Sequence, residues 1–111
     1  MLSKNRRLNL RKEYRYVTSG RKFMTPSLTV FSRRADLVEP MVGIALAKAK
    51  FRQATDRNRA RRLTSKAIEQ LYSSLRPDMK LVIIPKSQVL DKTPDELKGE
   101  LEDVKDLFVA D

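Results

Sequence analysis

Apolar side chains recur with helical spacing near the start of the chain. Leu10, Tyr14 and Val17 stand at positions i, i+4 and i+7, which places them on one face of a helix. Asn9 is a residue type that caps helix N-termini, and Gly20 is well placed as the residue that ends such a helix. The pattern therefore predicts a first helix between these two residues.

The next segment changes to the period of a β-strand. In "SLTVFS" (27–32) Leu28 and Val30 point to one face, while Thr29 and Phe31 point to the other, as in a half-buried strand. This alternation predicts a strand with side chains available on both of its faces.

Three further segments have strand character. Residues 41–48 ("MVGIALAK") alternate bulky and small side chains, so one face of this strand is nearly bare. A bare face is often covered by another element, and it also lets a ligand approach the backbone closely. Residues 79–85 ("MKLVIIP") form an apolar run typical of a strand buried on both faces. A short strand around residues 22–25, before Pro26, is a possible addition.

Helical spacing returns twice in the second half. A long helix is predicted from Ala54 to Leu75, with Asp56 as its N-cap. Its apolar face is formed by Ala60, Leu63, Ala67 and Leu71. "TPDE" (93–96) predicts a capping box that opens a last helix. The apolar stripe of that helix is formed by Leu97, Leu101, Val104 and Phe108.

The predicted order is helix, strand, strand, helix, strand, helix. This order indicates an α+β sandwich in which helices pack on a mostly antiparallel sheet. The 111 residues contain no repeat and no Gly/Ser linker, so we expect one domain over residues 1–111. No apolar run reaches the roughly 18 residues of a membrane-spanning helix, and no signal-peptide core is evident. We therefore expect a cytoplasmic protein with no membrane partner.

The net charge of +10 is unevenly distributed. Residues 1–66 hold 18 Lys and Arg against 4 Asp and Glu, whereas residues 67–111 hold 6 against 10. The basic part is therefore expected to face a polyanion, with nucleic acid favoured over an anionic membrane surface. The chain has no cysteine and no histidine, which excludes thiolate catalysis, Ser-His triads and Cys/His metal sites.

The run "RNRARR" (57–62) concentrates this charge on one side of the long helix. Asn58, Arg62 and Lys66 fall opposite the apolar face, with Arg59 beside them. Arg57 and Arg61 lie one turn apart on a flank. A guanidinium matches phosphate with a planar fork of donors and also stacks on bases. A charge run by itself is more often simply solvated, but its opposition to an apolar face favours an anion-binding surface.

At this point the sequence resembles a known family. "RNRARR" at the start of a helix, after the strand segment "VGIALAKAKFRQA", is similar to the signature of the bacterial ribonuclease P protein subunit. The similarity extends to "RLNLRKEYRYVTSGRKF", "DMKLVIIPKS" and the capped last helix, over about residues 6–108. Two features depart from the family pattern. The loop "KAKFRQA" has spaced lysines and no glycine, and Thr18 stands where a second aromatic is common.

The resemblance implies a small α/β sandwich with a mixed sheet of about four strands. It also implies that the long helix lies in a left-handed β-α-β crossover. The protein would assist a catalytic RNA that removes the 5′ leader of precursor tRNA, as a monomer with one copy per RNA. Mg²⁺ would be required by the RNA, and no cofactor would be bound by the protein itself.

The resemblance also implies two groups of binding residues. The residues that would contact the catalytic RNA are Arg57, Asn58, Arg59, Arg61, Arg62, Lys66, Lys48 and Lys50. The residues that would line a cleft for the single-stranded leader are Tyr14, Val17, Thr29, Phe31 and Ala45. Core positions remain an alternative for Tyr14 and Phe31, and Phe51 is expected to anchor the loop.

Two other functions remain open. A ribosomal or other structured-RNA-binding protein would fit the composition equally well. A protein-only nuclease fits less well, because histidine is missing and the basic region has no cluster of carboxylates.

Overall fold

The computed structural model describes residues 4–47 and 49–108 of the chain. The helices and strands are α1 (Leu10–Thr18), β1 (Arg21–Met24), β2 (Leu28–Arg34), β3 (Met41–Ile44), α2 (Ala54–Leu71), β4 (Met79–Pro85) and α3 (Pro94–Glu102). Short 3-10 turns are η1 (Lys4–Arg6), η2 (Tyr72–Ser74), η3 (Ser87–Asp91) and η4 (Lys105–Leu107). The predicted order of elements is confirmed, including the short additional strand before Pro26. No helix in this described part combines the length and apolar character needed to cross a membrane.

The four strands form one mixed sheet in the order β1-β2-β4-β3. The pairs β1–β2 and β2–β4 are antiparallel, and β3–β4 is parallel. Parallel neighbours cannot be joined by a tight turn, so the chain crosses from β3 to β4 through α2. The α+β class and the mixed four-stranded sheet are therefore confirmed. The left-handedness of the crossover stays a prediction.

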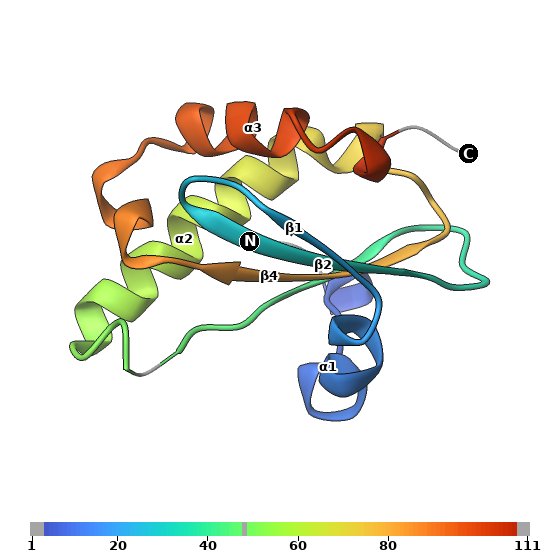
Figure 1. Ribbon diagram of the computed structural model, residues 1–111, viewed down its shortest axis with the longest axis horizontal. Coiled ribbons are helices and arrows are strands. Elements are labelled where there is room, and N and C mark those ends of the chain that lie inside the picture. Colours follow the sequence, from blue (N-terminus) through green and yellow to red (C-terminus); the bar gives the residue numbers. More distant parts are fainter. Residues whose placement is uncertain (1–3, 48, 109–111) are drawn as a thin grey trace.

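Helices cover both faces of the sheet (Figure 1). α2 and α3 lie on one face, and α1 lies on the other. Leu28 and Val30 are buried in the main core between the sheet and α2/α3, whereas Phe31 packs on the α1 side. On the central strand β4, Ile83 belongs to the main core and Val82 to the α1 side. The predicted faces of both strands are thus confirmed.

β3 is shorter than the strand predicted over residues 41–48. It is an edge strand whose pairing with β4 ends at Ile44, opposite Ile83. The alternation of side chains nevertheless continues past this point. Leu46 packs against the main core, and Ala45 packs on the α1 side. The alternating burial therefore extends further along the chain than the strand pairing, which is why the sequence predicts a longer strand.

Both ends of α1 were located correctly, but one for a different reason. The Asn9 side chain accepts a hydrogen bond from the Lys12 backbone N–H, which confirms the N-cap. Gly20 follows the helix without adopting a positive φ. A Cβ at Gly20 would instead lie 2.3 Å from the backbone oxygen of Ser32. Glycine is therefore required by the close approach to β2, not by left-handed backbone geometry.

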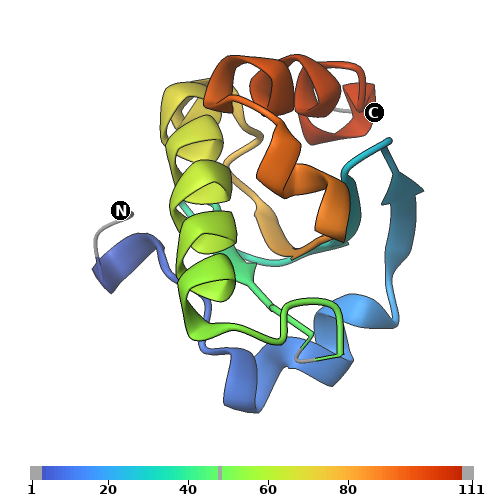
Figure 2. The ribbon, with the colours of Figure 1, turned by 90° about the vertical axis from the view of Figure 1, so that its left-hand side faces the viewer.

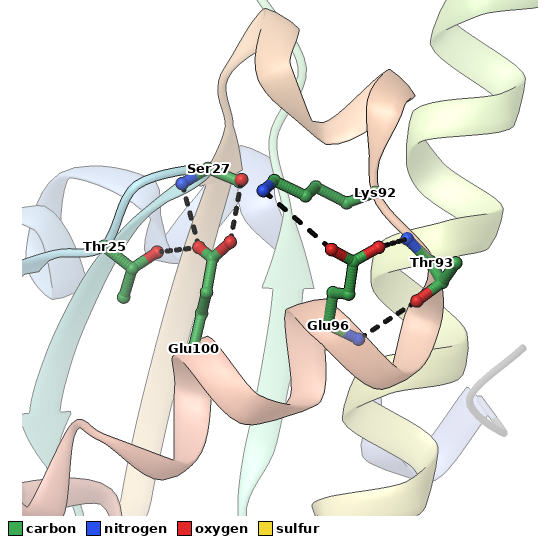
Figure 3. A network of polar contacts seen from close by, with 6 residues as sticks. All are labelled: Thr25, Ser27, Lys92, Thr93, Glu96 and Glu100. Atoms are coloured by element: carbon green, nitrogen blue, oxygen red, sulfur yellow. Dashed lines mark hydrogen bonds and ion pairs between the residues drawn. The ribbon is translucent and has the colours of Figure 1, made fainter.

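α3 is fixed at its start and along its inner side (Figure 3). Thr93 and Glu96 form the predicted capping box, with both reciprocal hydrogen bonds present. One turn later, the Glu100 carboxylate accepts hydrogen bonds from the Thr25 hydroxyl at 2.7 Å and the Ser27 backbone N–H at 2.8 Å. Its second oxygen accepts the Ser27 hydroxyl at 2.8 Å. This carboxylate therefore ties α3 to the turn between β1 and β2.

The apolar stripe predicted for the last helix was wrong at its end. α3 stops at Glu102, and the chain continues into the 3-10 turn η4. Val104 and Leu107 are buried, while Phe108 is only partly buried. A 3-10 turn repeats every three residues, so the inward position after Val104 falls on Leu107 rather than on Phe108.

Tyr72 joins the end of α2 to the loop before β3. Its buried hydroxyl donates a hydrogen bond to the Pro40 carbonyl, and the Arg6 guanidinium lies 4.2 Å from its ring centroid. Burial raises the pKa of the Tyr72 phenol above its ordinary value of 10.0. The Glu39 carboxylate raises it further, and Arg6 opposes both effects.

Candidate nucleic-acid interface

α2 begins two residues before the predicted cap. Gln53 has an extended backbone and is the N-cap, and its carbonyl accepts the Arg57 N–H at 3.1 Å. Asp56 lies inside the first turn, so its assignment as N-cap was wrong. Its charge still suits the N-terminal end of the helix dipole. Residue type alone could not place the cap, because Ala54 and the residue after it also adopt helical geometry.

The outer side of α2 carries a group of exposed polar residues, four of them cations, which we call the basic face. The basic face consists of Asn58, Arg59, Arg61, Arg62 and Lys66. The opposite side of the helix is buried in the main core through Ala60, Ala67 and Ile68. Within the described residues, no carboxylate forms an ion pair with the basic face. The core therefore holds these cations at the surface, where they are available to an external anion.

Arg57 differs from the arginines of the basic face. It is half-buried, and its Nη1 donates to the Phe51 carbonyl at 2.8 Å and to the Arg52 carbonyl at 3.1 Å. Phe51 is 1% exposed and belongs to the main core, as expected for a loop anchor. Arg57 therefore ties this loop to the first turn of α2. Both bonds use Nη1, so neither Nε nor Nη2 takes part in them.

The two loop lysines predicted to support this surface are not equally described. Lys48 lies outside the described residues. Lys50 is exposed in a turn, where its backbone N–H donates to the Ala47 carbonyl at 3.1 Å. Lys50 therefore places a charge near the start of α2 without taking part in the core.

The predicted leader residues lie on the other face of the sheet, around a small apolar cluster. The buried members of this cluster are Leu8, Val17 and Val82, and its partly buried members are Leu10, Phe31, Met41, Ala45 and Ile84. The fold thus brings Val17 of α1, Phe31 of β2 and Ala45, just after β3, into one cluster. Val17 is 0% exposed, so it packs beneath this surface and supports α1.

Tyr14 and Thr29 extend the same side of the molecule. Tyr14 is 40% exposed on α1, and its hydroxyl forms no hydrogen bond within the described part of the chain. Thr29 is half-buried on β2 and lies on the same strand face as Phe31. The Lys22 ammonium stands 5.8 Å from the Phe31 ring centroid. An accessible aromatic ring and a cation beside a second ring are the elements that hold single-stranded nucleic acid.

The bare face of β3 is partly covered by the chain itself. A Cβ at Gly43 would lie 2.6 Å from the Leu10 Cδ2 and 3.3 Å from the Leu8 Cβ. Of the two interpretations of this face, coverage by another element therefore applies at Gly43. Ala45, two residues later, is only half-buried and therefore remains partly accessible.

A hollow that the sequence did not indicate lies beside the basic face. It has a volume of about 330 Å³ and is bounded by the N-terminal segment, β3 and α2. Arg7, Arg61 and Ser65 contribute its polar side chains. Only Arg61 belongs to the recognisable charge run. The pattern around Arg7 indicates a solvated surface, and the pattern around Ser65 indicates the interior of a helix. Among the described residues there is no cluster of three or more acidic side chains placed to hold a metal ion.

Comparison with known proteins places the chain among ribonuclease P proteins. A family model described as Ribonuclease P matches residues 2–107. The Ribonuclease P protein component of Salmonella arizonae is 37% identical over 67 residues, which cover 60% of this chain and 56% of that protein. The protein of the same name from Cronobacter sakazakii is 33% identical over 78 residues, covering 70% of this chain and 65% of that protein. The matched region thus spans between half and two thirds of the length of these curated relatives.

Solved structures give the same result for the fold. The RNase P protein of Thermotoga maritima, in complex with 1-(4-fluorophenyl)-2-thiourea, superposes with a TM-score of 0.80 at 18% identity. That match covers 95% of this chain and 100% of the other. A Staphylococcus aureus RNase P protein superposes with a TM-score of 0.78 at 16% identity, over 94% of this chain and 98% of that one. Identities this low establish a shared fold and nothing finer.

Proposed function

The chain belongs to the ribonuclease P protein family, and we propose that it is the protein subunit of a bacterial ribonuclease P. In this role it binds a catalytic RNA and the 5′ leader of precursor tRNA, and so assists endonucleolytic removal of the leader. The observation that carries the proposal is the basic face, which is exposed, free of carboxylate partners among the described residues and anchored through its back to the core.

Docking to RNA follows from the chemistry of this face. Arginine forks bind phosphates bidentately, and each neutralised phosphate releases counterions. Four cations on the basic face would therefore give a strong dependence of affinity on salt, with a slope of about −0.9 per duplex phosphate contact. We assign Arg59, Arg61, Arg62 and Lys66 to this contact, with Asn58 beside them. Arg57 adds its free donors, and Lys48 and Lys50 extend the charge along the loop.

The α1 side of the sheet would hold the leader. Stacking of a base on an exposed aromatic ring contributes about 1–3 kcal/mol. Tyr14 offers such a ring, and Phe31 offers a partly buried one under the Lys22 ammonium. Thr29 and Ala45 complete the surface, and Val17 supports it from below. A single strand is favoured over a duplex because this surface contains aromatic residues, on which unpaired bases stack.

In this proposal the protein performs no bond-making step. The RNA would carry the chemistry with its own Mg²⁺ ions, and one protein monomer would serve each RNA. The protein's part is electrostatic and positional. It offsets phosphate repulsion where the RNA folds against α2, and it holds the leader on the opposite face of the same sheet.

Cleavage of precursor tRNA tests the proposal directly. Purified protein is added to a bacterial ribonuclease P RNA and a 5′-labelled precursor tRNA at low Mg²⁺, where the RNA alone cleaves slowly. We expect faster leader removal with wild-type protein and a smaller gain with Arg59→Ala/Arg62→Ala. A protein that binds this RNA without any gain in cleavage would instead be a structured-RNA-binding protein of another kind. Cleavage without added RNA would indicate a protein-only nuclease.

The leader surface has its own test. Tyr14→Ala is expected to weaken binding of precursor tRNA with a leader, by about fivefold or more for one lost stacking contact. The same variant should bind mature tRNA, which lacks the leader, as the wild type does. Equal losses for both substrates would show that Tyr14 acts on the fold or on the catalytic RNA.

A further inference from the structure

The hollow beside the basic face has a well-defined frame. The N-terminal segment runs along the free edge of β3, where the Leu8 N–H donates to the Val42 carbonyl at 3.0 Å. Arg7 and Val42 form a parallel bridge at the same place. One wall is thus held to the sheet by backbone bonds, and the facing wall is the rigid helix α2. The hollow is therefore part of the folded structure and does not depend on a loose loop.

The lining of the hollow combines apolar and polar groups. Its apolar surface comes from Leu8, Leu10, Val42 and Ile44, together with the backbone of Gly43. Two exposed arginines, Arg7 and Arg61, stand among the lining residues. No ion pair within the described residues involves either guanidinium. The site therefore offers an apolar bed with positive charge beside it and no competing carboxylate.

Ser65 supplies a second, independent feature. It is 4% exposed, yet it lines the hollow, and its hydroxyl makes no hydrogen bond in the described part of the chain. Thr64, its neighbour in sequence, satisfies its own hydroxyl by donating to the Ala60 carbonyl at 2.8 Å. The Ser65 hydroxyl oxygen is not sealed inside the protein, so it can bond to a group that enters the hollow. The open side of Ser65 is the hollow, so a ligand there would find a donor and acceptor beside apolar carbons.

We propose that this hollow is a binding site for one unpaired ribonucleotide of the RNA that docks on the basic face. The base would lie on the apolar bed, the Ser65 hydroxyl would bond to a base edge or a ribose hydroxyl, and the phosphate would lie between Arg7 and Arg61. This site rests on the proposed function and deepens it, because it adds recognition of a single nucleotide to a surface that otherwise recognises phosphates.

The size and chemistry of the hollow favour a nucleotide over other occupants. A volume of about 330 Å³ lies at the small end of ligand pockets, which hold about 300–1,000 Å³. A lipid chain would leave Ser65 without a partner, and a bare phosphate would leave the apolar bed empty. An extruded nucleotide fills both parts, and unstacked bases are what proteins recognise in single-stranded RNA.

The first test uses 5′-AMP as the probe and backbone amide NMR of the whole chain as the readout. We expect saturable shifts at Gly43, Ile44 and Ser65 with millimolar 5′-AMP, and no saturable shift there with inorganic phosphate. Ser65→Leu, which fills the hollow, should abolish these shifts. Ser74→Leu adds the same leucine at an exposed position in η2 and should retain them. Shifts confined to the basic face, or unchanged by Ser65→Leu, would overturn the site.

The second test asks whether the nucleotide belongs to the RNA. Affinity for a bacterial ribonuclease P RNA is measured for wild type, Ser65→Leu and Ser74→Leu at several salt concentrations. We expect Ser65→Leu to bind about tenfold more weakly and Ser74→Leu to match the wild type. Saturable 5′-AMP binding with unchanged RNA affinity would overturn the assignment to RNA and indicate a free mononucleotide. If the wild type itself fails to bind the RNA, the proposed function fails, and the 5′-AMP test still decides the site.

The folding of the variants is checked separately. Ser65→Ala removes the hydroxyl without adding volume, and it serves if Ser65→Leu unfolds. It should keep the wild-type melting temperature within a few degrees and weaken 5′-AMP binding by severalfold. Unchanged 5′-AMP binding by a folded Ser65→Ala would remove the hydroxyl from the proposed site.

Discussion

Arg57→Ala separates the structural role of this arginine from its charge. In the structure, one guanidinium nitrogen donates to two carbonyls of the preceding loop, at 2.8 Å and 3.1 Å. The first acceptor belongs to Phe51, whose ring is buried in the main core. Removing the guanidinium leaves a part-buried carbonyl without this donor, so the substitution is expected to lower stability as well as charge.

The expected loss follows from the surroundings of the two bonds. Hydrogen bonds to charged groups contribute about 1.5–3 kcal/mol when buried. Here the bond to Phe51 is part-buried and the bond to Arg52 is exposed, so water replaces most of the second. We expect a total loss of about 1–2 kcal/mol in the free energy of unfolding. For a domain of this size, that corresponds to a fall of at least about 4 °C in melting temperature.

The matched control is Arg59→Ala, two residues further along the same helix. Arg59 is exposed and makes no hydrogen bond or ion pair with described side chains, so its loss should change stability by less than about 0.5 kcal/mol. The slope of log affinity for RNA against log salt concentration should become shallower by about 0.9 per lost phosphate contact. Arg57→Lys should restore the charge and the salt dependence but only part of the stability. Equal melting temperatures for Arg57→Ala and Arg59→Ala would refute the structural role.

Other perturbations test the frame that holds these surfaces. Gly20→Ala forces a Cβ to within 2.3 Å of a β2 backbone oxygen and should lower the free energy of unfolding by about 1–3 kcal/mol in urea titrations. Gly99→Ala meets open space inside a helix and should raise it by about 0.5–1 kcal/mol, so a loss there would contradict the helix assignment. Glu100→Gln replaces one of two accepting oxygens with a donor and should destabilise the protein by about 1–3 kcal/mol, with melting as the measurement. The raised pKa of Tyr72 means that the unfolded chain loses this proton first, so the stability it contributes is complete below pH 10 and is lost as the pH rises further. Tyr72→Phe should therefore be less stable at neutral pH, because the hydrogen bond to Pro40 is lost. Above pH 10 its free energy of unfolding should fall less with rising pH than that of the wild type. The same pH dependence in both proteins would contradict the raised pKa.

The sequence predicted features that depend on neighbours along the chain. The capping box at Thr93 and the Asn9 cap are local hydrogen-bond patterns, and the two faces of β2 follow from strict alternation. The errors occur where contacts distant in sequence determine the structure. The N-cap of α2 is Gln53 rather than Asp56, and the buried residue near the end of the chain is Leu107 rather than Phe108. In both cases the predicted residue type suits the role, but in the folded chain a residue one to three positions away fills it.

The candidate site divides in the same way. Helical spacing was sufficient to place the basic face opposite the core, because the basic and the apolar residues belong to the same helix. It could not reveal that Arg57 is partly engaged by the loop before the helix. Nor could it pair Arg7 with Ser65 across a hollow, since these residues are far apart in sequence and meet only when the N-terminal segment lies along β3.

The distribution of charge over the two packed helices restricts how an RNA could approach. α3 lies against α2 on the same face of the sheet (Figure 2). Its outward side carries the exposed carboxylates Asp95, Glu96, Glu102 and Asp103. Phosphates attracted to the basic face would be repelled from this neighbouring side, and the interaction weakens over a Debye length of about 8 Å at physiological salt. An RNA docked on α2 is therefore expected to extend away from α3, towards β3 and the N-terminal segment. That direction leads past the hollow beside Arg61 and on to the α1 side, where the leader surface lies.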